Sequence, residues 1–131
     1  MAEHPDCTLV RRAYDRFTRG DMDALAELMT GDVTHHVPGE SPLSGHHKGR
    51  EACVQLYRRN YDETGGTLRV ELDTLLADGR GHVIAVHRCR AQREGRHLDM
   101  REGLFFTIVG GKISDIDECH EDIDTSNEFW R

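Results

Sequence analysis

Three glycine-containing connectors divide the second half of the chain into four segments that are long enough to be strands. The connectors are residues 78–81 (Asp-Gly-Arg-Gly), residues 94–96 (Glu-Gly-Arg) and Gly110-Gly111. Because glycine adopts the positive φ values that tight hairpin turns require, each connector predicts a hairpin. The expected strands cover about residues 67–77, 82–93, 97–109 and 112–121. Since their connections are short, they are expected to be antiparallel neighbours.

The first half of the chain has the apolar spacing of helices. Helices are expected over residues 8–19, over a short segment after Asp21, and over residues 49–63. The first of them carries one apolar stripe, made of Leu9, Val10, Ala13, Tyr14 and Phe17. Thr8 or Asp6 can cap its start, and Gly20 suits its end. A short strand, residues 33–37, and a loop, residues 40–48, separate the second and third helices, and residues 122–131 form a short tail compatible with a helix.

Helices that precede an antiparallel sheet indicate an α+β fold. Strands of ten or more residues twist and curl strongly. A curled sheet with helices across its concave side forms a cone, whose open end is a natural pocket. The length of 131 residues predicts one domain over residues 1–131.

Composition excludes several classes of protein. The 17 Lys and Arg against 24 Asp and Glu give a net charge of −7, which argues against a nucleic-acid partner. No apolar run has the roughly 18 residues of a membrane span, and residues 1–6 lack the features of a signal peptide. The four Cys have no CxxC spacing, which predicts reduced thiols in a cytoplasmic protein without a structural metal.

Strand alternation sorts the polar residues that can reach the pocket. His35 shares a face with Val33 and Val37, and His36 lies on the other face. On the last strands, the apolar positions select an inward set made of Glu102, Leu104, Phe106, Ile116, Glu118 and His120. On the strand over residues 82–93, either Val83, Ala85, His87 and Cys89 or Ile84, Val86, Arg88 and Arg90 face inward. The first set is favoured, because the second would bury two arginines.

Tyrosine hydroxyls on the helices can complete the pocket as hydrogen-bond donors. Tyr14, Tyr57 and Tyr61 all lie on helix faces expected to line the cone. Each candidate also has an ordinary structural alternative, such as core packing for the tyrosines, a rim position for Glu102 or a helix cap for Asp122. The pair His46-His47 stands in a loop beside Lys48 and is interpreted as solvated, so no metal site is expected.

Several segments together resemble the NTF2-like superfamily, and specifically its SnoaL-like branch of polyketide cyclases and ketosteroid-isomerase-like proteins. They are GDMDAL, GDVTHHVPG, SPLSGHHKGREA, GLFFTIVGGKISDIDE and DIDTSNEFW, and the resemblance covers about residues 8–130. It implies a cone-shaped α+β barrel with an apolar cavity and a homodimer formed through the outer sheet face. It also implies acid–base chemistry without a metal or an organic cofactor.

The resemblance also suggests roles for individual residues. In ketosteroid isomerases the strand matching residues 33–37 carries the aspartate that abstracts the proton; that position falls on His35, or on His36 if the register slips by one. Histidine there is a departure from the family pattern, although it suits proton transfer near neutral pH. SnoaL-like cyclases carry a carboxylate from the late strands into the cavity, and this role falls on Asp122 or Glu118.

The sequence therefore predicts a cofactor-independent enzyme that acts on a hydrophobic, carbonyl-bearing small molecule by isomerisation, cyclisation or dehydration. The expected catalytic residues are His35, Glu102, Glu118 and Asp122, and the expected substrate contacts are Tyr14, His36, Tyr57, Tyr61, His87, Leu104, Phe106 and His120. An epoxide hydrolase using Asp99, Arg101 and Asp117 is an alternative, although alternation turns these residues outward. A non-catalytic binding or dimerisation domain is the other alternative.

Overall fold

The computed structural model describes residues 3–131, so expectations for Met1 and Ala2 lie outside the described residues. The elements follow in the order α1 (Pro5–Thr18), α2 (Met22–Glu27), β1 (Met29–Val37), β2 (Gly45–Lys48), α3 (Arg50–Asp62), β3 (Arg69–Ala77), β4 (His82–Arg93), β5 (Arg96–Val109), β6 (Lys112–His120) and α4 (Ile123–Trp130). The four predicted long strands and the three predicted N-terminal helices are all present.

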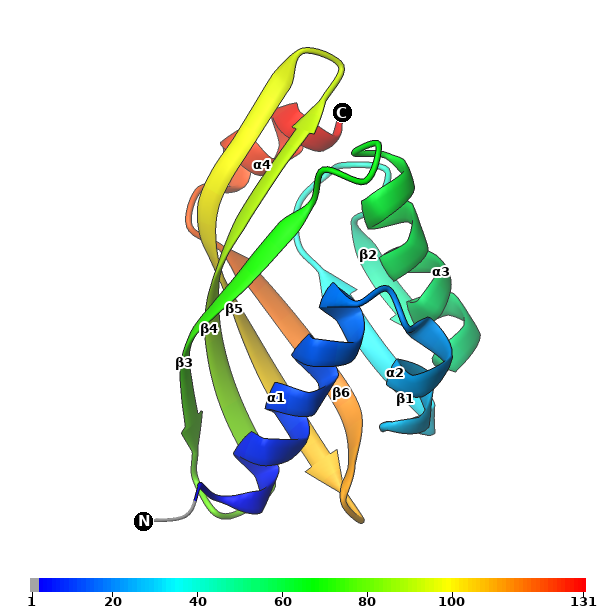
Figure 1. The fold of residues 1–131 in the computed structure, drawn as a ribbon, viewed down its shortest axis with the longest axis vertical. Helices are drawn as coiled ribbons and strands as arrows, with labels where there is room; N and C mark the ends of the chain where they lie inside the picture. The colour runs from blue at the N-terminus through cyan, green and yellow to red at the C-terminus, as the bar shows by residue number, and fades with distance from the viewer. Residues whose placement is uncertain (1–2) are drawn as a thin grey trace.

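The six strands form one curved sheet in the order β2-β1-β6-β5-β4-β3. All neighbours are antiparallel except β1 and β6, which are parallel. Helices α1, α2 and α3 cover one side of the sheet, and α4 lies near the end of the β4–β5 hairpin (Figure 1). The α+β class expected from the sequence is confirmed.

The structure corrects three boundaries. Helix α1 begins at Pro5, not Thr8, because proline suits the first helical turn and Nδ1 of His4 accepts a hydrogen bond from the Asp6 amide. Strand β1 begins at Met29 and passes through an irregularity before Thr34. The predicted loop over residues 40–48 contains strand β2, which is only four residues long and carries no apolar alternation.

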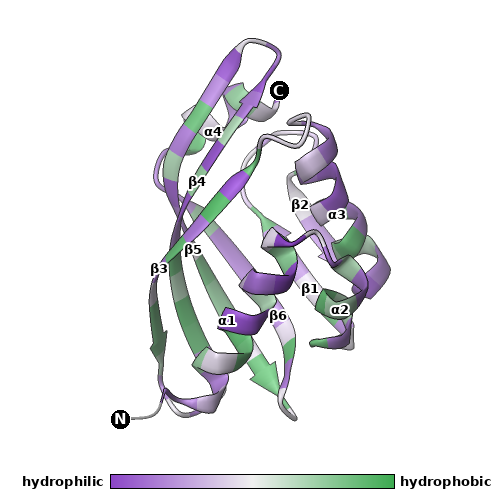
Figure 2. Cartoon of the chain, in the orientation of Figure 1, coloured by the Kyte–Doolittle hydropathy of each residue, from purple (hydrophilic) through white to green (hydrophobic). Residues whose placement is uncertain are grey.

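The inner face of the sheet and the covering helices form the core. Fully buried side chains include Val10 of α1, Cys53 of α3, Val33 of β1 and Ile113 of β6. Each large apolar side chain removed from water stabilises the fold by about 1.5–3 kcal/mol. Figure 2 shows the apolar residues gathered along β4, β5 and β6 where α1 covers the sheet.

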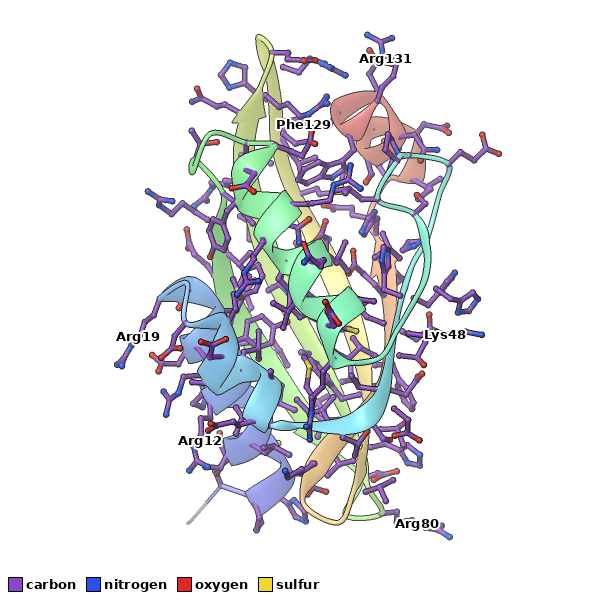
Figure 3. The ribbon with its side chains drawn as sticks, turned by 90° about the vertical axis from the view of Figure 1, so that its right-hand side faces the viewer. Arg12, Arg19, Lys48, Arg80, Phe129 and Arg131 are labelled. Atoms are coloured by element: carbon purple, nitrogen blue, oxygen red, sulfur yellow. The ribbon has the colours of Figure 1, made fainter. Side chains whose placement is uncertain are left out.

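Many charged side chains lie at the periphery of the molecule. Arg12, Arg19, Lys48 and Arg80 project outward in Figure 3. All four cysteines are free thiols, as their spacing predicts. Within residues 3–131, none of the helices is both long enough and apolar enough to cross a membrane.

Hydrogen bonds hold helix α4 at its start, at its end and at Asn127 within it. The Asp122 carboxylate caps its start by accepting from the Thr125 amide at 3.1 Å. Arg93 donates to the Arg131 carbonyl at the other end, at 2.7 Å. The Asn127 side chain accepts from the Glu40 amide at 2.8 Å, which ties α4 to the loop between β1 and β2.

Candidate active site

A cavity of about 110 Å³ lies between the concave face of the sheet and helices α1 and α3. Its lining is mainly apolar and comes from all parts of the chain, including Phe17, Leu25, Leu56, Leu104, Phe106, Ile113, Ile116 and Trp130. Seven polar or titratable lining residues gather in one group of hydrogen bonds and close contacts, which we call the inner cluster: Tyr14, His35, Tyr57, His87, Glu102, Glu118 and His120. A concave apolar site with a few convergent polar groups is the usual form of a small-molecule site.

The first arm of the inner cluster runs from α3 to β6. The Tyr57 hydroxyl lies 2.7 Å from Nδ1 of His35. Nε2 of His35 lies 2.7 Å from Oε1 of Glu118. His35 pairs with Ile116 across the parallel β1–β6 ladder, so Glu118, two residues farther along, lies on the same face beside it.

The second arm repeats this order of groups from α1 to β5. The Tyr14 hydroxyl lies 2.6 Å from Nδ1 of His87. Nε2 of His87 lies 2.9 Å from Oε1 of Glu102. His87 and Glu102 are direct partners in the β4–β5 ladder, which places both side chains on the inner face.

His120 joins the two arms. It is the partner of Glu102 in the β5–β6 ladder. Its Nε2 lies 2.5 Å from Oε2 of Glu118 and 3.4 Å from Oε2 of Glu102. Its side chain is only 3% exposed, and its Nδ1 has no hydrogen-bond partner among the described residues. The inner cluster therefore contains one buried imidazole nitrogen with unused hydrogen-bonding capacity.

The charges of the cluster are set by mutual contact. Burial raises the pKa of Glu118, but hydrogen bonds from His120 and His35 and electrostatic attraction to the two rings outweigh it, so that the pKa is far below its ordinary value. Burial lowers the pKa of His120, but its hydrogen bond to Glu118 and the charges of Glu102 and Glu118 outweigh it and raise that pKa. Glu118 is thus a carboxylate, and the imidazolium form of His120 is favoured.

Both tyrosines of the cluster keep their protons. Burial raises the pKa of Tyr14 well above its ordinary value, and the charges of Glu102 and Glu118 add to that rise. Burial likewise raises the pKa of Tyr57, with smaller contributions from Cys53 and Glu118. Each phenol can therefore donate to Nδ1 of its histidine, which leaves the ring proton on Nε2 to be donated to the carboxylate.

Most residues that alternation selected meet at the cavity. The lining includes Tyr14, His35, Tyr57, His87, Glu102, Leu104, Phe106, Glu118 and His120. On β4 the favoured set of Val83, Ala85, His87 and Cys89 is buried. Asp99, Arg101 and Asp117 are exposed, as alternation predicts, so the residues considered for epoxide hydrolysis do not face the cavity.

Three residues named from the sequence lie elsewhere. Asp122 is exposed and caps α4, so the expectation that it reaches the cavity is corrected. His36 lies on the opposite face of β1 to His35, 3.0 Å from Asp117 and stacked on His46. Tyr61 donates to the Phe17 carbonyl at 2.8 Å and is not among the lining residues, because it faces the α1–α3 contact.

The lining residues at the end of the cavity near α4 were not predicted from the sequence. Pro38, Ser41, Leu43, Asn60, Ser126 and Trp130 belong to the lining. They come from a loop, a helix and the tail, where no strand alternation indicates direction. The apolar pair Phe129-Trp130 was the available signal, because such residues in a tail imply packing against the domain.

Among the described residues, Glu102, Glu118 and His120 form a group whose ligand atoms are close enough together to be considered as a metal site. Each offers one ligand atom, and these atoms lie within 4.8 Å of one another. Nε2 of His120 and Oε2 of Glu118 are already bonded to each other, however, at a distance too short for a metal ion between them.

The geometry agrees with comparisons of the chain with known proteins. The model of the SnoaL-like domain matches residues 10–116. The chain belongs to the SnoaL-like family. Its six-stranded curved sheet with covering helices is the NTF2-like fold, to which this family belongs.

This SnoaL-like chain has relatives along its whole length. An uncharacterized protein of Mycobacterium tuberculosis is 36% identical over 130 residues, which are 99% of each chain. The structure of Bal32a, from a soil-derived mobile gene cassette, is 38% identical with a TM-score of 0.94 and 97% coverage of both chains. A second M. tuberculosis protein was solved in complex with estradiol-17β-hemisuccinate. It is 15% identical with a TM-score of 0.78, and the match covers 94% of this chain and 98% of that one. At this identity the similarity establishes a shared fold only.

Proposed function

We propose that this SnoaL-like protein is a cofactor-independent enzyme that moves protons on a hydrophobic, carbonyl-bearing small molecule inside its cavity. The reaction is of the isomerisation, cyclisation or dehydration type. The observation that carries this proposal is the inner cluster, which brings three imidazoles and two carboxylates to the wall of an otherwise apolar cavity. Buried titratable groups in a cleft, with perturbed pKa values, are typical of functional sites.

The chemistry of such a substrate matches the groups present. Removal of a proton next to a carbonyl requires a base at the carbon and a donor at the oxygen that becomes negatively charged. Carboxylates and histidines provide the base and the donor. Charge interactions are stronger in a site that excludes water, so the apolar lining strengthens the effect of each group on the transition state.

The apolar lining also supports the class of ligand. The M. tuberculosis protein of the same fold was solved with a steroid ester, an apolar ligand with oxygen groups. We extend to this chain only the general chemistry, namely an apolar body with a polar oxygen. The acid–base reaction is favoured over epoxide hydrolysis because Asp99, Arg101 and Asp117 are exposed on the outer face.

We further propose that the protein is a homodimer formed through the outer face of the sheet. Leu76, Ile84 and Phe105 are exposed large apolar residues. Leu76 is the register partner of Ile84, and Ile84 is the register partner of Phe105, so they form one row across β3, β4 and β5. Exposed apolar side chains in a continuous patch are typical of an interaction surface.

The enzyme proposal is tested by proton exchange. Aryl and alicyclic ketones are incubated with the protein in D₂O, and loss of the α-proton signal is followed by NMR. We expect catalysed exchange for at least one ketone, and its loss in the double variant Glu102→Gln/Glu118→Gln. Asp99→Asn, on the outer face, is the matched control and keeps full activity. Ketones that bind and stabilise the protein without any exchange would instead establish the non-catalytic binding domain.

A further inference from the structure

We infer that His120 gives its Nδ1 proton to the substrate oxygen, that Glu102 is the base, and that His35 and His87 are positioning residues. This inference rests on the proposed function and assigns the two roles within it. The sequence left His35 as either the base or an orienting group, and this inference selects the orienting role. It follows from which ring nitrogens and carboxylate oxygens of the inner cluster already have hydrogen-bond partners.

The two histidines of the arms have no free nitrogen. Nδ1 of His35 contacts the Tyr57 hydroxyl and its Nε2 contacts Glu118. Nδ1 of His87 contacts the Tyr14 hydroxyl and its Nε2 contacts Glu102. A substrate could reach either imidazole only by breaking a buried hydrogen bond, which costs about 1–3 kcal/mol when the partner is left unsatisfied.

The two carboxylates differ in how many of their oxygens are already hydrogen-bonded. Both oxygens of Glu118 are hydrogen-bonded, Oε1 with His35 and Oε2 with His120. Glu102 has one short contact, from its Oε1 to His87. Its Oε2 lies 3.4 Å from His120, which is longer than an ordinary hydrogen bond. Oε2 of Glu102 is therefore the carboxylate oxygen that is most available to take a proton.

His120 provides the matching donor. Its buried Nδ1 has no partner within the described part of the chain, and native proteins rarely leave such a group unsatisfied without a reason. His120 lines the cavity, so an oxygen atom of a bound ligand is the natural partner. Glu118 contacts Nε2 of the same ring and holds it in place.

The proposed step balances with these two residues alone. Oε2 of Glu102 takes the proton from the carbon next to the carbonyl. The C–H electron pair forms a carbon–carbon double bond, while the carbonyl π pair moves to the oxygen and accepts the Nδ1 proton of His120. The product is the enol, with Glu102 protonated and His120 neutral. Return of the enol proton to His120, and of the Glu102 proton to the same or another carbon, restores both residues.

The roles can be separated with 2-tetralone as substrate and exchange in D₂O as the assay. We expect His120→Gln and Glu102→Ala each to reduce kcat by about 10²–10⁴-fold, the usual contribution of general acid–base catalysis. Formate should restore exchange to Glu102→Ala, because it can occupy the missing carboxylate position. Formate should not restore exchange to Glu118→Ala, whose lost carboxylate positions His120 and does not touch substrate.

A binding measurement provides a readout besides activity. 2-Naphthol has the shape of the enol of 2-tetralone, and its binding can be followed by its fluorescence. We expect His120→Gln to weaken this binding at least tenfold, whereas His36→Gln, on the outer face, leaves it unchanged. Circular dichroism under the assay conditions checks that the variants are folded, and His120→Asn replaces His120→Gln if the Gln variant is unfolded.

Three outcomes would overturn the assignment. If kcat for His120→Gln and for Glu102→Ala stays within threefold of the wild type while His35→Gln is inactive, His35 is the base. Equal rescue of both alanine variants by formate would remove the distinction between the carboxylates. Wild-type protein that binds 2-naphthol through His120 but exchanges no ketone would reject the proposed function and the roles with it, and would leave His120 only as a ligand contact.

Discussion

Nε2 of His35 lies 2.7 Å from Oε1 of Glu118, although 83 residues separate the two in the chain. The side chain of Glu118 is only 14% exposed and its other oxygen contacts His120. Glu118→Gln replaces one accepting oxygen by a donating amide, so one of the two histidine contacts becomes unfavourable. We expect a loss of about 3–5 kcal/mol in the free energy of unfolding, as for other broken buried pairs. Urea denaturation at neutral pH measures it, and a loss below about 1 kcal/mol would contradict the pairing.

The same cluster predicts how stability depends on pH. The pKa of Glu118 is lowered by folding, so its contribution is present above the ordinary value of 4.5 and is lost as pH falls below it. The pKa of His120 is raised by folding, so its contribution is present below the ordinary value of 6.5 and is lost as pH rises through the folded value. We expect the contribution of this pair to be largest between these two values.

Unfolding free energies measured from pH 4 to pH 9 test this expectation. Glu118→Gln should flatten the acid side of the curve, and His120→Gln should flatten the alkaline side. His36→Gln is the control, because His36 is only partly buried and lies on the opposite face of β1 from the inner cluster, beside Asp117. A curve that is the same in His120→Gln and in the wild type would show that His120 does not titrate with folding.

Gly39 is predicted to be required for the contact between the β1–β2 loop and α4. Its φ is +95°, and a Cβ atom there would collide with Oδ1 of Asn127. We expect Gly39→Ala to cost at least about 1–3 kcal/mol, the usual cost of a strained backbone, and to weaken 2-naphthol binding because α4 lines the cavity. Gly31→Ala is the matched control, since no atom lies within 4 Å of its Cβ position. Equal thermal denaturation midpoints for the two variants would contradict this prediction.

Asp122 is predicted to affect stability but not catalysis. Its carboxylate caps α4 through the Thr125 amide, and its side chain is not part of the cavity lining. We expect Asp122→Ala to lower the free energy of unfolding by about 1 kcal/mol, as for other N-cap losses. The kcat for 2-tetralone exchange should stay within twofold of the wild type at a temperature where both proteins are folded. A hundredfold loss of kcat would restore the catalytic role implied by the family resemblance.

The outer row of apolar residues predicts an effect on assembly. Phe105 is 42% exposed and lies between Ile84 on β4 and Asp117 on β6 in the sheet register. We expect Phe105→Glu to convert a dimer into a monomer in sedimentation velocity, because it places a charge within the apolar row of the proposed interface. Arg80→Glu, a charge change in the β3–β4 turn, should leave the dimer intact. A wild-type protein that sediments as a monomer would reject the homodimer.

Strand alternation predicted the polar wall of the cavity because its reasoning is local. Once Leu104 and Phe106 are assigned to the inner face, Glu102 must follow them, and the hairpins bring His87 and His120 to the same row. The pairing of each tyrosine with one histidine was not predictable in this way. It depends on how α1 and α3 are placed over the sheet, which no short-range pattern specifies.

The errors have equally physical causes. Strand β2 forms because β1 provides an edge with which residues 45–48 can pair, and this depends on the tertiary structure rather than on their own polar sequence. Asp122 was assigned from the family resemblance, but the turn after β6 directs its side chain to the amide of Thr125 instead. Positions just beyond a strand end are therefore poorly predicted by alternation within that strand.

The two tyrosines that end the arms belong to different helices, Tyr14 to α1 and Tyr57 to α3, whereas the groups they hold belong to the sheet. A sheet that forms before either helix docks would have its histidines and carboxylates in place but free to change tautomer and rotamer. Activity in proton transfer should therefore appear late during refolding, at the same time as the change in tyrosine fluorescence that accompanies burial of these side chains. Partially folded chains should be inactive even when their β-structure is complete.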